Sequence, residues 1–157
     1  MQRTKTSPVT VSGLRSHTGF WLRFVSNHIS HAFARKLVQS GVTVAEWVVL
    51  REMFEEDETS PSALAERIGM TRGGVSKLVD RLVGKALITR RQHSEDRRFQ
   101  TIALTRQGRS LIPQLATLAD KNDEESFHPL TTKEREALLA LMKKLVQAHN
   151  WQTLPTD

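Results

Sequence analysis

The chain has 157 residues, 38% of them hydrophobic and 25% charged, so it is large enough for one domain with a hydrophobic core and is not typical of a disordered protein. It contains no Cys, which excludes disulfides, thiolate zinc sites and cysteine nucleophiles. No apolar run approaches the roughly 20 residues of a membrane-spanning helix, and no apolar stretch follows the first cations as in a secretory signal. We therefore expect a soluble, cytoplasmic protein.

The positive charge is concentrated in one part of the chain. The formal net charge is +6, whereas residues 71–109 alone hold ten Lys and Arg and three Asp and Glu, a net charge of +7. The remaining residues are therefore close to neutral. Such a local excess is typical of a surface that binds a polyanion, although a solvated basic face would have the same composition.

Hydrophobic spacing and capping residues predict the helices before residue 60. The first 14 residues have no hydrophobic period and indicate a flexible arm. A helical period over residues 16–39 gives one wide apolar stripe, and Gly41 is suited to end this helix. Thr43 and Glu46 form a capping box that predicts the start of the next helix.

A pair of short helices follows, separated by a tight turn. Ser60 followed by Pro61 is a helix start, Gly69 ends this helix, and Thr71 caps a second helix that reaches residue 85. Two helices joined by a turn that contains Gly are typical of helix-turn-helix proteins.

The period then changes from helix to strand and back. Residues 87–92 and 99–104 are short β-prone runs on either side of a polar tip, which predicts a hairpin. Thr105 caps a long helix, and Thr131 with Glu134 forms a capping box for the last one.

The second helix of the helix-turn-helix pair has two different faces. At 100° per residue, one side is apolar, and consists of Val75, Leu78, Val79 and Leu82. The opposite side carries small and charged residues. Gly73 and Gly74 at the start of this helix each cost about 1 kcal/mol relative to Ala. We interpret them as allowing close approach to a bulky partner such as DNA, the alternative being that the first turn merely tolerates them.

This arrangement predicts a DNA contact in two grooves. A helix in the major groove would bring Ser76 and Lys77 to base edges, while Arg72 and Arg81 are better placed for phosphates. The Thr71 hydroxyl and the amides of the first turn can hold a further phosphate. The hairpin adds the second contact, through Arg91, Asp96, Arg97 and Arg98. Where Arg98 enters a narrow minor groove, Asp96 can hold its guanidinium in a fixed pose. The alternative is that the two residues form a weak ion pair on the protein surface.

These residues resemble the multiple-antibiotic-resistance regulator (MarR) family of bacterial winged helix-turn-helix proteins. The family's wing pattern D-x-R-x5-L-T-x-x-G is present as Asp96, Arg98, Leu104, Thr105 and Gly108, and residues 71–90 resemble its recognition segment. The resemblance implies a mainly α fold with a small β-hairpin wing. It also implies a homodimer that reads a near-palindromic DNA site, often with a small ligand that weakens binding. Ala86 departs from the family, which often has Gly there, so we expect the recognition helix to end differently.

The resemblance divides the chain into regions. Residues 1–14 are an arm and residues 15–157 one domain, with a winged lobe at 43–104 and dimerisation helices at 15–41 and 105–150. Eight apolar residues outside the lobe exceed what one small lobe can cover and are expected to pack on a partner, the alternative being that their helices fold back on the chain's own lobe. They are Phe20, Trp21, Phe24, Leu111, Leu115, Leu138, Leu141 and Leu145.

Aromatic residues beside these helices predict a ligand site. A cavity for a phenolic or aromatic acid is expected between the dimerisation helices and the lobe, although such residues are often plain core. Its predicted lining is Trp21, Phe24, His28, Trp47 and Phe54. His28 and His31 have no convergent partners, so we expect neither a metal site nor a cofactor.

The sequence thus predicts a sequence-specific regulator of transcription that binds double-stranded DNA, and a repressor that a small aromatic ligand releases. The alternative is a winged-helix module that binds another protein and no specific DNA. The chain has no catalytic motif for a hydrolase, a phosphate-loop enzyme, a metalloprotease or a dinucleotide-binding enzyme, so we do not expect an enzyme.

Overall fold

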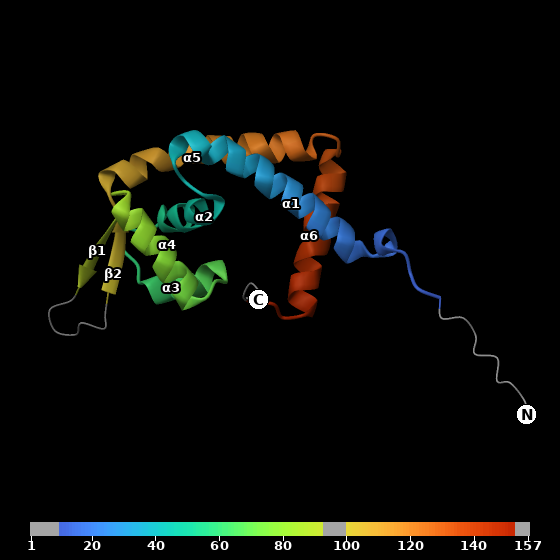
Figure 1. Ribbon diagram of the computed structural model, residues 1–157, viewed down its shortest axis with the longest axis horizontal. Coiled ribbons are helices and arrows are strands. Elements are labelled where there is room, and N and C mark those ends of the chain that lie inside the picture. The colour runs from blue at the N-terminus through green and yellow to red at the C-terminus, as the bar shows by residue number, and fades with distance from the viewer. Residues whose placement is uncertain (1–9, 93–99, 153–157) are drawn as a thin grey trace, which may run out of the picture.

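The computed structural model describes residues 10–92 and 100–152 and is mainly helical with one antiparallel hairpin (Figure 1). Its elements are a 3-10 turn at Leu14–Ser16, α1 (Thr18–Leu37), a second 3-10 turn at Val38–Ser40, α2 (Val44–Met53), α3 (Pro61–Ile68), α4 (Arg72–Gly84), β1 (Ile88–Gln92), β2 (Gln100–Leu104), α5 (Arg106–Phe127) and α6 (Thr132–Ala148). This is the fold class that the sequence predicts.

The helix starts follow the capping residues. Thr43 and Thr131 each form a complete capping box, with Glu46 and Glu134 respectively. Ser60, Thr71 and Thr105 each accept a hydrogen bond from the backbone three residues later, at the first turns of α3, α4 and α5. Each cap satisfies an amide that a helix start otherwise leaves without a partner.

The lobe consists of α2, α3, α4 and the hairpin, packed around one apolar core. The largest fully buried side chains come from all of these elements and from α5, and include Leu50, Leu64, Leu82, Ile88, Ile102 and Ile112. In the hairpin Ile88 pairs with Leu104 and Gln92 with Gln100. A third segment extends the hairpin, because Thr59 and Ile102 exchange both backbone hydrogen bonds, at 3.0 and 2.8 Å.

Helix α5 connects the lobe to the far end of the molecule, where α6 begins (Figure 1). Helix α1 packs along α5, and the buried Asn122 of α5 donates a hydrogen bond to the Ile29 carbonyl of α1. Lys36 joins the same contact, because its ammonium donates to the Asn122 side chain and pairs with Glu125 at 2.7 Å. These polar contacts fix the register of α1 on α5.

Two of the eight apolar residues that we expected on a partner-facing surface belong to the chain's own core. Leu115 is fully buried, and Leu111 packs against the core of the lobe. Both lie on the lobe half of α5, where α1 and α2 already cover the helix. The expectation is wrong for these two residues. The apolar stripe runs along α5, and the sequence does not show which part of that stripe α1 and α2 cover.

Helix α4 ends as a glycine-terminated helix would, despite Ala86. The Leu87 amide donates to the Leu82 carbonyl and the Ala86 amide to the Val83 carbonyl, which together form a Schellman motif. Ala86 occupies the left-handed position with φ of 57°. The expectation of a different helix end is therefore wrong, and the Ala side chain is held in a conformation that favours Gly.

Candidate nucleic-acid interface

The two faces of α4 are separated as the helical period predicts. Val75, Val79 and Leu82 are fully buried against the lobe core, and Leu78 is nearly so. All the predicted DNA-contacting residues on this helix and at its start are exposed: Thr71, Arg72, Gly73, Ser76, Lys77 and Arg81. The helix therefore presents a continuous polar and cationic face while its other face anchors it.

The first turn of α4 is open to a partner. The Thr71 hydroxyl caps the helix by accepting from the Gly74 amide at 3.1 Å, so it is already engaged in the cap. A Cβ atom at Gly73 would have no atom of the chain within 4 Å. No contact within the described part of the chain therefore explains this glycine.

Several cations of the basic segment are already paired. Lys85 pairs with Glu46 at 2.7 Å, Arg90 of β1 with Asp80 of α4 at 2.6 Å, and Arg109 lies 3.7 Å from Asp57. By contrast, no acidic group of residues 10–92 or 100–152 forms an ion pair with Lys77, Arg81 or Arg106. Fewer cations of the basic segment are thus available to a partner than the sequence count implies. Two of the available ones, Lys77 and Arg81, lie on the exposed face of α4.

The hairpin lies beside α4, and the Asp80–Arg90 ion pair joins the two elements. Arg91, the predicted contact residue on β1, is exposed. The other predicted wing residues, Asp96, Arg97 and Arg98, lie outside the described residues.

The C-terminal end of α4 is held by a buried carboxylate. Glu46, only 1% exposed, accepts hydrogen bonds from the Lys85 ammonium at 2.7 and 2.9 Å and from the Thr43 amide at 2.8 Å. Burial raises the pKa of Glu46, but the bonds from Lys85 and Thr43 and the Lys85 charge outweigh it, so that the pKa is lowered overall. Glu46 is therefore ionised and acts as the anchor for Lys85. The sequence shows only its role in the capping box.

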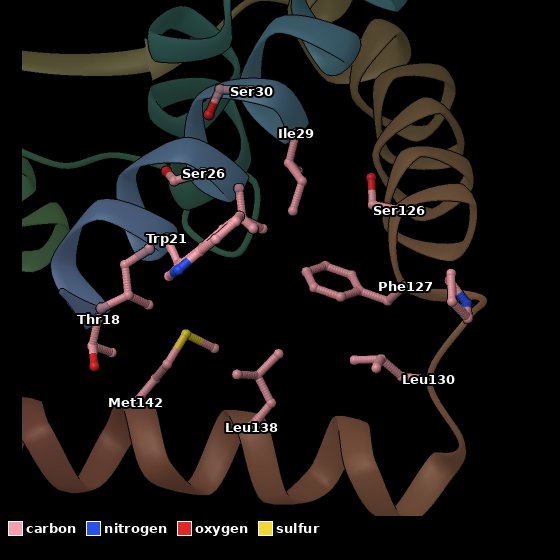
Figure 2. A pocket seen from close by; sticks show the side chains of 13 residues that line it. Thr18, Trp21, Ser26, Ile29, Ser30, Ser126, Phe127, Leu130, Leu138 and Met142 are labelled. Atoms are coloured by element: carbon pink, nitrogen blue, oxygen red, sulfur yellow. The ribbon is translucent and has the colours of Figure 1, made fainter. Parts of the chain in front are cut away.

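An apolar groove of about 560 Å³ lies between α1, the end of α5 and α6. Figure 2 shows Trp21 and Ile29 of α1, Phe127 of α5, and Leu138 and Met142 of α6 pointing into it. A smaller groove beside it is lined by Phe24, His28 and three further residues. Three of the five predicted ligand-lining residues, Trp21, Phe24 and His28, thus lie along one side of α1.

The other two predicted ligand-lining residues have different surroundings. Trp47 packs edge-to-face on Phe33, with ring centroids 6.3 Å apart. Phe54 lies near two guanidinium groups, with the central carbons of Arg51 and Arg109 at 5.9 and 5.6 Å from its ring centroid. The single chain does not bring these two aromatic residues to the grooves on α1.

No helix of the described residues is long and apolar enough to cross a membrane. No three His, Asp or Glu side chains within residues 10–92 and 100–152 come together in a way that could hold a metal ion.

Comparison with known proteins identifies the fold. A probable transcriptional regulator from Pseudomonas aeruginosa is 25% identical with a TM-score of 0.78, covering 85% of this chain and 99% of that one. A mutant of MarR from E. coli complexed with operator DNA is 24% identical, with a TM-score of 0.75 and coverages of 82% and 92%. BpsR from Bordetella bronchiseptica, whose DNA binding is regulated by 6-hydroxynicotinic acid, is 23% identical, with a TM-score of 0.79 and coverages of 87% and 97%.

The family model described as MarR family matches residues 40–98, which include α2, α3, α4 and β1. This segment contains the helix-turn-helix pair whose exposed face is described above, and the fold match extends over most of the chain. The chain is thus similar to MarR-family proteins, because residues 40–98 match the family model and the fold matches a MarR structure over 82% of the chain.

Proposed function

We propose that this chain is a sequence-specific transcriptional regulator that binds double-stranded DNA in the cytoplasm and acts as a repressor. The observation that carries the proposal is the exposed cationic face of α4, whose opposite face is buried in the lobe core. Such a helix fits the major groove of DNA. Two of the related structures support the proposal, because one contains operator DNA and another concerns regulation of DNA binding. We assign no catalytic activity to the chain.

Within this proposal the contacts divide by type. Ser76 and Lys77 read base edges, while Arg72 and Arg81 contact phosphates and fix the register of the helix. Thr71, Gly73 and Arg91 lie close to the backbone, and Asp96, Arg97 and Arg98 remain predicted contacts of the wing.

We further propose that the chain acts as a homodimer, with residues 43–104 as the DNA-binding lobe and residues 15–41 and 105–150 as dimerisation helices. Helix α6 has no buried residue, and Leu141 is 60% exposed. On α1, Trp21, Phe24 and Val25 are each about half exposed. A helix without a buried residue has little tertiary packing to stabilise it, so α6 needs a partner, and a second copy offers the matching apolar surfaces.

The same region is the proposed site of a small effector. Trp21, Phe24 and His28 lie along grooves whose other walls come from α5 and α6. A small aromatic acid there would contact the dimerisation helices and change the spacing of the two lobes. Trp47 and Phe54 would belong to this site only if the second copy or a movement of the lobe brings them closer. The regulation of BpsR by 6-hydroxynicotinic acid supports an effector of this chemical class.

The first prediction separates DNA binding from folding. Replacing Gly73 with Ala should stabilise α4 by a few tenths of a kcal/mol, up to ~1 kcal/mol, because Ala is the better helix former. The added Cβ should nevertheless weaken DNA binding about tenfold, or about 1.4 kcal/mol, because it would stand where the helix start comes closest to the DNA backbone. Thermal unfolding and fluorescence anisotropy on a duplex selected from a random library measure the two effects.

Lys77→Ala is the comparison variant for this prediction. It should leave the melting temperature unchanged and alter which bases the protein selects, because Lys77 is exposed and forms no ion pair in the described part of the chain. If Gly73→Ala binds the selected duplex as tightly as the wild type and Lys77→Ala selects the same bases, α4 does not read DNA. Binding of a protein partner without preference for duplex DNA would then favour the interaction module.

A further inference from the structure

We propose that residues 85–87, at the C-terminal end of α4, form a joint that sets the spacing between the two DNA half-sites, with Lys85 as its main positioning residue. The inference rests on the proposed DNA binding and dimerisation and goes beyond them, because it names the residues that select one operator spacing. None of these residues is among the proposed DNA contacts.

The Lys85 side chain ties the end of α4 to α1 and α2. Its ammonium donates to the Gly41 carbonyl at 2.7 Å, in the left-handed turn that follows α1. It also pairs with both oxygens of Glu46, a residue of the first turn of α2. One charged group therefore connects the proposed recognition helix to the end of a proposed dimerisation helix.

The next two residues tie the same helix end to α5. The Thr105 hydroxyl donates to the Ala86 carbonyl at 2.7 Å, and the Thr105 amide donates to the Leu87 carbonyl at 3.0 Å. Gly108 of α5 lies so close that a Cβ there would be 2.1 Å from the Leu87 carbonyl oxygen. The backbone of α5 and that of residue 87 are thus in direct contact.

Both attachments therefore meet within three residues, beside the strained Ala86. A rotation of α1 or α5 at this point tilts α4 and changes the distance to the recognition helix of the second copy. Ala86 at φ of 57° occupies a narrow well, whereas Gly in the same place has wide freedom. The joint is stiff because Ala rather than Gly stands at its centre.

The test measures selectivity for spacing. The wild type first selects a palindrome from a random duplex library, and its Kd is then measured on duplexes with one base pair removed or with one or two inserted between the half-sites. One insertion moves a half-site by about 3.4 Å and rotates it about 34° around the axis, so the wild type should bind at least about tenfold more weakly.

Two variants loosen the joint in different ways. Glu46→Gln with Lys85→Met removes the ion pair without leaving a buried charge, and Ala86→Gly removes the strain without reducing stability. For each variant, the loss of affinity caused by one inserted base pair should fall to about threefold or less, or the spacing that binds best should shift by one base pair. Affinity for a duplex with a single half-site should stay within about twofold of the wild type, because the face of α4 is unchanged.

Lys85→Arg, which keeps the charge, and Lys133→Met, on the exposed start of α6, should both retain the wild-type spacing profile. If Ala86→Gly and the double variant lose affinity equally at every spacing, residues 85–87 only stabilise the fold and the joint is refuted. If the double variant does not fold, the Ala86→Gly profile alone decides. A wild type that selects no duplex would refute the proposed function itself, and the joint with it.

Discussion

Replacing Gly108 with Ala should lower the free energy of unfolding by about 3 kcal/mol, near the upper end for overpacked sites. A Cβ at this position would lie 2.1 Å from the Leu87 carbonyl oxygen and 3.0 Å from its carbon. Both are backbone atoms, and the same carbonyl accepts the Thr105 amide, so no flexible side chain can move aside. The start of α5 would have to separate from the start of the hairpin. Urea unfolding followed by circular dichroism measures the loss.

Gly84→Ala is the matched control for this experiment. Gly84 is also helical, but a Cβ there would have no atom within 4 Å, so this variant should be as stable as the wild type or slightly more stable. A loss of less than 1 kcal/mol for Gly108→Ala would show that the close approach between α5 and Leu87 is not rigid.

Replacing Lys85 with Met should cost about 3 kcal/mol at neutral pH, near the lower end for removing one partner of a buried ion pair. Glu46 is 1% exposed and would keep its charge without the cation that compensates it. The cost is at the lower end because the Lys85 side chain is 38% exposed, so that water can reach part of the site. The midpoint of chemical unfolding at pH 7 gives this difference.

The pH dependence of the Lys85→Met effect has a definite sign. In the wild type the lowered pKa of Glu46 means that its contribution to stability is present above the ordinary value of 4.5 and is lost as the pH falls through the folded value. Without Lys85 two of the causes that lower the pKa of Glu46 are gone, so the carboxyl takes up a proton at a higher pH than in the wild type and acid neutralises the unpaired charge. The gap in stability between wild type and variant should therefore narrow from pH 7 to pH 4. A gap of constant size would show that Lys85 acts through packing alone.

The double variant Glu46→Gln with Lys85→Met provides the control, since it removes both charges and keeps a side chain able to accept from the Thr43 amide. It should recover most of the stability lost in Lys85→Met. If it is as unstable as the single variant, an uncompensated charge is not the cause.

The parts of this structure that could be predicted from sequence depend on local rules. Capping residues such as Thr43 and Thr131 mark helix starts, because the hydrogen bonds they form span only three residues. The helical period predicts which face of α4 is buried. It also predicts that the residues on the opposite side, Gly73, Ser76 and Lys77, are exposed.

The remaining features depend on contacts between distant residues. The Lys85–Glu46 pair joins residues 39 positions apart, and the Thr59–Ile102 bridge joins residues 43 positions apart. A count of cations could not distinguish Lys77 from Arg90. The difference is that Arg90 forms an ion pair with the Asp80 carboxylate, a contact that the count does not include. The stripe on α5 likewise could not show that Leu115 is already covered while α6 remains exposed.

A dimer that presents two cationic α4 faces to duplex DNA can be tested most directly by sedimentation velocity of the protein with a labelled duplex. The free protein should sediment near twice 17.8 kDa, and two chains should bind each selected duplex. The affinity should fall by roughly 10³-fold between 50 and 200 mM salt, because phosphate contacts release counterions. A monomer that leaves every duplex free at low salt would contradict the account.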